Sequence, residues 1–137
     1  MATLILDDAS VVLNSVDLSD HVKSVALTYE ADLQDNTAMG DNTKSNQGGL
    51  KNWSMDVTFN QDFAAGEVDA TIFPIVGSDV PVVVKPTSAA VSATNPSYSG
   101  TGVIGSYNPM GGSVGDLQQT SVSISPANHT DLTRATS

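Results

Sequence analysis

The chain contains two strand-like runs that are separated by a long polar segment. Lys51 to Asn60 alternates strictly between apolar and polar residues, and Val22 to Glu30 alternates in a weaker form. A period of two is typical of a strand that buries one face. Paired antiparallel, the two runs predict a ribbon with one apolar face and one small, polar and acidic face. The apolar face takes Val25, Leu27, Tyr29, Trp53, Met55, Val57 and Phe59.

The segment between the two runs, Ala31 to Leu50, is rich in Asp, Asn, Gly and Thr and has neither helical nor alternating order. A loop of this length without structure is uncommon in a compact domain unless it is functional or disordered. Two interpretations follow. The segment is either a mobile surface loop or an arm that becomes ordered against another copy or partner.

The charge of the chain limits its partners. Five basic and fifteen acidic side chains give a formal net charge of −10 over 137 residues. Binding of nucleic acid by counterion release needs clustered Lys and Arg, whereas the cations here are scattered. The acidity therefore serves either solubility or the repulsion of a polyanion. The five cations are Lys23, Lys44, Lys51, Lys85 and Arg134.

Length and composition predict one mainly β domain. The aromatic fraction is only 5%, which favours a thin β core. The absence of cysteine removes disulfides, thiolate metal sites and cysteine nucleophiles together. The N-terminal apolar run is too short for a signal peptide, and no run approaches the roughly 18 apolar residues of a membrane span. We expect a protein that is made in the cytoplasm and has no membrane partner.

The remaining elements complete a β domain over residues 1–125. A helical stripe predicts one short helix at about residues 65–73, with Asp62 as its N-cap and Gly77 just past its end. Residues 126–137 lack periodicity and are expected to form a tail that is free unless a neighbour binds it. Further strands are predicted at Leu4–Leu6, Val11–Leu13, Val16–Leu18, Val80–Lys85, Tyr98–Tyr107 and Gln118–Ser125, the last with a second polar face of Gln119, Ser121, Ser123 and Ser125.

Several motifs that resemble catalytic, cofactor-binding or metal-binding patterns lack the structural context that their chemistry requires. Gly111, Ser113 and Gly115 fit a nucleophile elbow followed by Asp116 and His129, but this serine lies in a Pro/Gly turn between strands. Gly100, Gly102 and Gly105 fit a dinucleotide-binding pattern, but no helix follows, so they indicate a bulge or a close backbone approach. His21 and His129 are far apart, and Asp32, Asp35 and Asp41 lack calcium-loop spacing. We predict no enzyme, no cofactor and no metal site.

Three segments carry a resemblance to a known family. They are "VVLNSVDLSDHVKSVALTYEAD", "LKNWSMDVTFNQDFAAGEVDATIFPIVGSDVPVVVKPTSAAVSATNPSYSGTGVIGSY" and "GGSVGDL". The chain resembles the major tail (tail tube) proteins of long, flexible-tailed bacteriophages of siphophage type, particularly those that infect actinobacteria. The resemblance implies a small antiparallel β-sandwich or barrel with one short flanking α-helix. It also implies ring-shaped homohexamers that stack into a tube for DNA, in which a long loop reaches the adjacent ring.

The resemblance assigns roles to residues. Trp53, Phe59, Tyr29 and Phe73 are expected in the core, and Phe63 or Ile72 fastens the helix to the sheet. Lumen-facing candidates are Ser24, Thr28, Glu30, Ser54, Asp56 and Thr58, and candidates for the inter-ring loop are Asp32, Asp35, Met39, Asp41 and Lys44. Which polar face lines the lumen stays open at this point.

The same resemblance implies partners and a location. The partners are further copies of the chain and the tape measure, tail terminator and tail tip proteins, while DNA passes through the lumen without specific binding. The protein is expected in the virion tail after assembly in the host cytoplasm. Alternatives are a capsid decoration or tail terminator protein, or a partner- or carbohydrate-binding β-sandwich module. The module would need an exposed aromatic platform, whereas the alternation places Trp53 on the apolar face.

Overall fold

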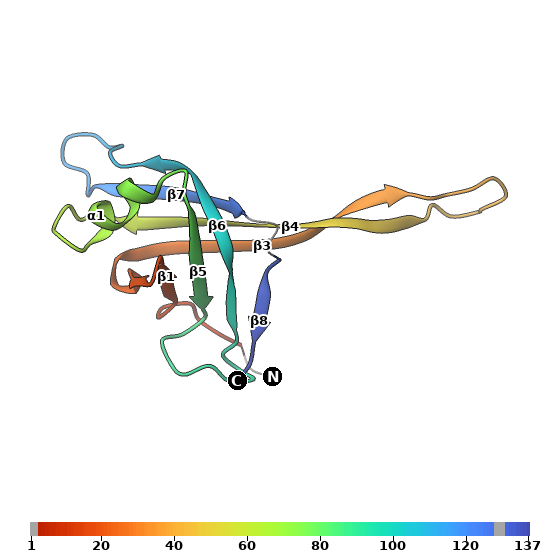
Figure 1. Ribbon diagram of the computed structural model, residues 1–137, viewed down its shortest axis with the longest axis horizontal. Coiled ribbons are helices and arrows are strands. Elements are labelled where there is room, and N and C mark those ends of the chain that lie inside the picture. Colours follow the sequence, from red (N-terminus) through yellow and green to blue (C-terminus); the bar gives the residue numbers. More distant parts are fainter. Residues whose placement is uncertain (1–2, 128–130) are drawn as a thin grey trace.

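A computed structural model describes residues 3–127 and 131–137 as one curled antiparallel sheet with a short helix (Figure 1). The strand order is β2-β1-β5-β6-β7-β4-β3, and β8 pairs with β6. The helical elements are η1 (Ser19–His21), α1 (Val68–Ile72) and η2 (Phe73–Ile75). The strands are β1 (Ser10–Leu13), β2 (Val16–Asp17), β3 (Val22–Asp35), β4 (Asn46–Asn60), β5 (Asp79–Lys85), β6 (Ser97–Asn108), β7 (Gln119–Pro126) and β8 (Thr133–Ala135).

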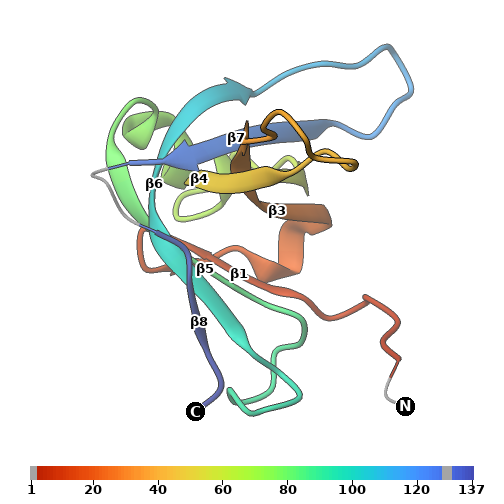
Figure 2. The same ribbon diagram turned by 90° about the vertical axis from the view of Figure 1, so that its right-hand side faces the viewer.

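The sheet curls so that its two ends lie on opposite sides of one apolar core (Figure 2). This arrangement matches the predicted small β-sandwich or barrel with one short helix. The alternation of β4 puts Trp53, Met55, Val57 and Phe59 into that core, as expected. From the other strands the core takes Val11, Leu13, Val80, Val82, Val84, Ile104, Val122 and Ile124, and from the helical segments and turns Leu18, Val68 and Ile72.

The segment 31–50 is largely strand, which corrects the prediction of an unstructured loop. β3 and β4 stay paired to Asp35 and Asn46, with a register shift between Ala31 and Leu33, and the ribbon projects far from the domain (Figure 1). Backbone hydrogen bonds hold the two strands together here. Every residue from Thr28 to Asn52 is exposed, so neither face needs apolar residues and no alternation marks the strands.

The helix begins later than predicted. Gly66 has a φ of +78°, and Glu67, in extended geometry, precedes α1 as its N-cap without a side-chain hydrogen bond. Asp62 is therefore not the N-cap, although its Oδ1 accepts a hydrogen bond from Ala64 N at 2.9 Å. Gly77, with φ of +83°, ends the helical segment as expected.

Three aromatic side chains that were expected to pack against the core are exposed. Ile72 is buried and fastens α1, while Phe63 is 58% exposed. The core assignments of Phe73 and Tyr29 were wrong, since these side chains are 67% and 48% exposed. Phe73 starts η2 on the outer side of the helical segment, and Tyr29 lies where the β3–β4 ribbon leaves the domain.

The two ends of the chain also differ from expectation. Residues 4–6 form no strand and are exposed. The tail is not free throughout, because β8 pairs with the start of β6, which β7 does not reach. The hydroxyl of Tyr29 donates to Asp131, at 3.0 Å to Oδ1 and 3.1 Å to Oδ2. The other strands confirm the prediction to within two residues.

Candidate assembly and channel surfaces

The six lumen candidates lie together on one face of the β3–β4 ribbon. Ser24 is the cross-strand partner of Thr58, and Thr28 is the partner of Ser54. Asp56 faces Ala26, and Glu30 faces Asn52, whose Nδ2 donates to Glu30 Oε1 at 3.5 Å. Residues that are directly opposite in an antiparallel pair share a face. The six side chains therefore form a continuous polar strip.

The second polar face predicted from the sequence joins this strip. In the β4–β7 pair, Asp56 is opposite Ser123 and Thr58 is opposite Ser121. The strip continues onto β6, where Ser106 is opposite Ser123 and Asn108 is opposite Ser121. One polar surface therefore covers four adjacent strands, β3, β4, β7 and β6. We name it the polar face.

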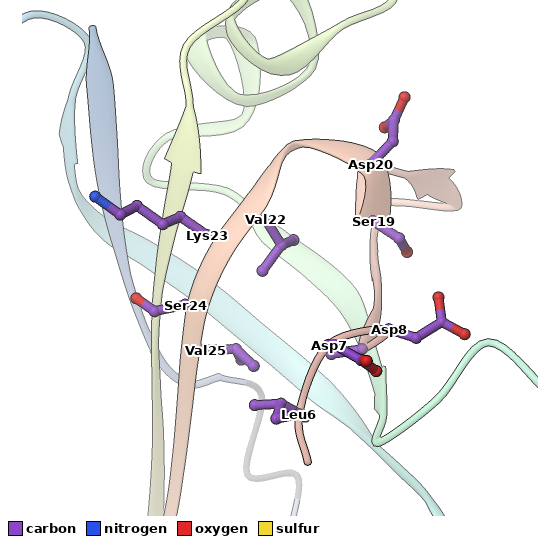
Figure 3. Close-up of a pocket in the computed structure, with 10 residues that line it drawn as sticks. Leu6, Asp7, Asp8, Ser19, Asp20, Val22, Lys23, Ser24 and Val25 are labelled. Carbon is purple, nitrogen blue, oxygen red and sulfur yellow. The ribbon is translucent and has the colours of Figure 1, made fainter. Parts of the chain in front are cut away.

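One cation lies at the edge of the polar face. The register of β3 shifts between Val22 and Ser24, so that Lys23 has no cross-strand partner in the pairing with β4. Figure 3 shows Lys23 and Ser24 on the same side of β3, opposite Val22 and Val25. The strip of six candidates carries the carboxylates of Glu30 and Asp56, and its other members are hydroxyl side chains. The strip therefore carries two negative charges, and Lys23 at its edge offsets one of them.

The second candidate surface is the projecting part of the ribbon, residues 31–51, which we name the arm. It holds none of the buried core residues. Leu33 and Leu50 are 65% and 86% exposed, and Met39 at the tip is fully exposed. These exposed apolar side chains make the arm a candidate contact surface.

Local hydrogen bonds preform the tip of the arm. Asn36 N donates to Ser45 O at 3.0 Å, and Ser45 N donates to Thr37 Oγ1 at 2.7 Å. Ala38 N donates to Asp41 Oδ2 at 2.8 Å, and the adjacent Gly40 has a φ of +93° that suits a turn without a Cβ. The tip therefore has a defined shape before any partner binds.

The inter-ring candidates all lie on the arm. Asp32 and Asp35 belong to β3, and Met39, Asp41 and Lys44 belong to the tip. The backbone N–H and the hydroxyl of Thr37 beside the carboxyl of Asp35 lower the pKa of this residue. The arm thus carries fixed negative charge together with its exposed apolar side chains.

The two glycine motifs lie in a loop and in a strand. Gly111, Ser113 and Gly115 lie in the loop between β6 and β7, where Ser113 N donates to Asp116 Oδ2 at 3.1 Å. His129, the last member of the apparent triad, lies outside the described residues. Gly102 packs against Trp53 and Ile124, while Gly105 lies at the register shift of β6, so a close approach and a bulge are both confirmed.

The described residues contain no helix that is long and apolar enough to cross a membrane.

Comparison with solved structures identifies the fold. The chain matches a protein of the virion of a native gene transfer agent (GTA) particle with a TM-score of 0.65 at 15% identity, over 92% of this chain and 95% of that one. It matches the tail of an empty GTA particle, refined with C6 symmetry, with a TM-score of 0.60 at 15% identity, over 82% of each chain. It also matches the SPP1 tail tube with a TM-score of 0.71 at 12% identity, over 95% of this chain and 77% of that one.

These likenesses define the class of fold. The chain has the fold of tail tube and virion proteins in phage-like particles, over almost its whole length. No protein-family model matches the sequence, and no curated protein is significantly similar to it. The likeness is therefore one of three-dimensional structure, at sequence identities of 12–15%.

Proposed function

We propose that this chain is the tail tube subunit of a phage-like particle of siphophage type, with a structural rather than a catalytic role. The observation that carries the proposal is the shared fold with the SPP1 tail tube over 95% of the chain. Two features of the chain agree with it, the preformed arm and the single polar face. In this proposal the protein lies in the virion tail, after assembly in the host cytoplasm.

The sheet supplies edges for ring formation. Within the described residues β3 pairs only with β4, which leaves its other edge open, and β2 pairs only with β1. An exposed edge of this length invites pairing with another chain. Edge-to-edge contact between copies closes a homohexameric ring. Six-fold (C6) symmetry is the symmetry given for the GTA tail. A closed ring removes the open edges.

The arm supplies the axial contact between rings. It points away from the domain along the longest axis of the molecule (Figure 1). The loop between β6 and β7 lies at the opposite end of that axis (Figure 1). Its exposed apolar side chains, Met110, Val114 and Leu117, are available to the arm of the next copy. Contact between two different surfaces of identical subunits propagates an open stack. Partners at the ends of the stack, in this proposal, are the tape measure, tail terminator and tail tip proteins.

The polar face lines the channel in this proposal. Short hydroxyl side chains and two carboxylates offer DNA no aromatic surface on which bases stack and only Lys23 as a cation. The two carboxylates of the polar face repel phosphates, and the net charge of −10 of the whole chain acts in the same direction. The genome therefore slides through without specific binding.

The alternatives differ in assembly. A capsid decoration protein binds a shell and needs no stacking arm, and a tail terminator forms one ring. A carbohydrate-binding module needs a platform of aromatic rings, but Trp53 is only 2% exposed. Tyr29 lies at the base of the arm, whereas Phe63 and Phe73 flank α1 at the other end (Figure 1). These rings form no common platform.

Electron microscopy of the purified protein over a range of concentrations tests the proposed function. We expect stacked rings with an axial channel, either from the protein alone or after addition of a tail tip complex that templates them. Binding to capsids without tubes under both conditions contradicts the tail tube function and supports a decoration protein. Single rings that never stack support a terminator.

Asp56→Lys tests the channel assignment. Asp56 is exposed at the middle of the polar face, so the substitution leaves the core intact and changes the charge of each subunit by +2. A ring of lysines in the channel attracts phosphate and slows DNA movement. We expect normal tails and DNA ejection slowed several-fold, measured by dye release from purified particles. Asp79→Lys, at an exposed position of β5 outside the polar face, the arm and the loop after β6, is the charge-matched control. Equal ejection rates for both variants and the wild type contradict the assignment.

A further inference from the structure

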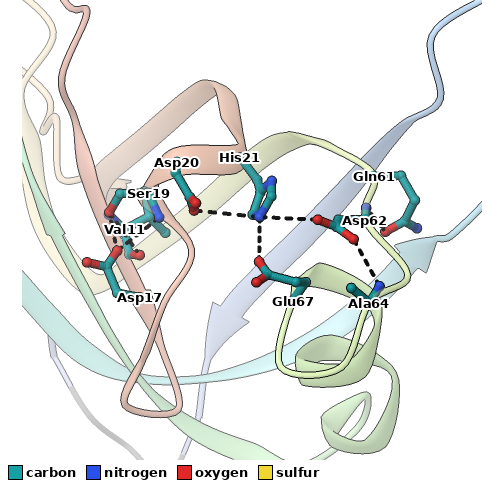
Figure 4. A network of polar contacts seen from close by, with 9 residues as sticks. All are labelled: Val11, Asp17, Ser19, Asp20, His21, Gln61, Asp62, Ala64 and Glu67. Atoms are coloured by element: carbon teal, nitrogen blue, oxygen red, sulfur yellow. Dashed lines mark hydrogen bonds and ion pairs between the residues drawn. The ribbon is translucent and has the colours of Figure 1, made fainter.

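One imidazole nitrogen is surrounded by three carboxylates outside the surfaces described above (Figure 4). Nε2 of His21 lies 2.5 Å from Glu67 Oε2, 3.6 Å from Asp20 Oδ1 and 3.7 Å from Asp62 Oδ2. Asp20 and His21 belong to η1, Asp62 follows β4, and Glu67 precedes α1. Three separate parts of the chain therefore bring ligand-type atoms to one place.

The negative charge of this cluster is not balanced by the protein. Within the described residues, no Lys or Arg forms an ion pair with Asp20, Asp62 or Glu67, and their only ion-pair partner is His21. Even a protonated imidazole leaves an excess of two negative charges. The side chains of His21 and Glu67 are 17% and 37% exposed, whereas that of Asp20 is 78% exposed, so the cluster opens to solvent at Asp20.

The donor set and its spacing suit a metal ion. One ligand atom each from Asp20, His21 and Glu67 lies within 4.8 Å of the other two. In a tetrahedral zinc site with bonds of about 2.0–2.1 Å, ligand atoms are about 3.4 Å apart. The distance from Nε2 to Asp20 Oδ1, 3.6 Å, is already close to this value, and Glu67 has to withdraw by about 1 Å. A nitrogen donor among carboxylates favours a transition metal over Ca²⁺ or Mg²⁺.

We propose that Asp20, His21 and Glu67 form a binding site for a divalent transition-metal ion such as Zn²⁺. Asp62 adds negative charge beside the site. Its carboxylate is oriented by the hydrogen bond that Oδ1 accepts from Ala64 N, which leaves Oδ2 facing the imidazole. The bound ion joins η1 to the segment before α1 and stabilises the folded domain.

Zn²⁺ binding to the purified full-length chain tests the site. We expect saturable binding of one ion per chain by titration calorimetry. At a Zn²⁺ concentration about 100 times the Kd, we expect the Tm to rise by roughly 5–10 °C. Mn²⁺ gives a second readout that needs no substitution, because it should broaden the NMR signals of His21 and Glu67 before those of other residues.

Variants locate the ion. His21→Gln and Glu67→Gln should each weaken Zn²⁺ binding by at least about tenfold. Asp7→Asn, at an exposed acidic residue near η1, and His129→Gln, at the other histidine of the chain, should bind like the wild type. If there is no saturable binding, or if both ligand variants bind as tightly as the wild type, the site is overturned. The proposal does not depend on the tail tube function, because every readout uses the isolated chain.

Discussion

We expect that replacing residues 32–50 with Asn-Gly yields a folded domain that no longer forms the tubes proposed above. Ala31 and Lys51 are cross-strand partners, and Asn-Gly favours the two-residue type I′ turn that closes such a pair. The arm holds none of the core residues, so its loss removes no buried apolar contact. We expect a free energy of unfolding within about 1 kcal/mol of the wild type, as for surface changes. Assembly should be lost because the proposed axial contact is gone.

The measurement combines thermal unfolding of the subunit with electron microscopy under conditions in which the wild type forms tubes. A second variant, Leu33→Ser with Leu50→Ser, keeps the length of the arm and removes two of its exposed apolar side chains. If apolar contact drives stacking, this variant also stacks poorly. Tubes of normal length from the truncated chain would refute the axial role of the arm.

The strands that could be predicted from the sequence are those with one buried face. Burial requires alternation, and β4 shows it from Trp53 to Phe59. The same requirement is absent in the arm, where both faces meet solvent. Its pairs, such as Leu33 with Gly48, lie beyond a register shift, so the register that Tyr29 and Trp53 set nearer the core does not predict them either.

Contacts between residues far apart in the sequence explain most of the other features that the sequence did not predict. Alternation identified the polar residues of β4 and β7, but only the register places Asp56 opposite Ser123 and merges two faces into one. The short strand β8 follows from a free stretch of β6 edge at Ser97–Ser99, which no local pattern signals. Likewise, nothing in the spacing of His21 and Glu67 along the sequence indicates that they meet.

The sequence alone does not show why β6 contains several glycines, whereas the packing of the strand does. Substitution of Gly102 is the strongest test of this packing. A Cβ at this position would lie 2.5 Å from Ile124 Cγ2, 3.1 Å from Ser125 O and 3.1 Å from Trp53 Cη2. Trp53 and Ile124 are both buried, so neither has free space into which to move. Overpacking of this kind costs about 1–3 kcal/mol. For Gly102→Ala we therefore expect a Tm lower by roughly 3–10 °C.

Gly105→Ala is the matched control, because it makes the same substitution in the same strand. Gly105 is exposed and does not have a positive φ, and a Cβ there would meet no heavy atom of a non-neighbouring residue within 4 Å. Alanine there loses less chain entropy on folding than glycine, so its stability should equal or slightly exceed that of the wild type. Equal Tm values for the two variants would show that Trp53 and Ile124 can yield to a methyl group. A selective loss in Gly102→Ala would establish that the close contacts with Ile124 and Trp53, rather than strand flexibility, require glycine at this position.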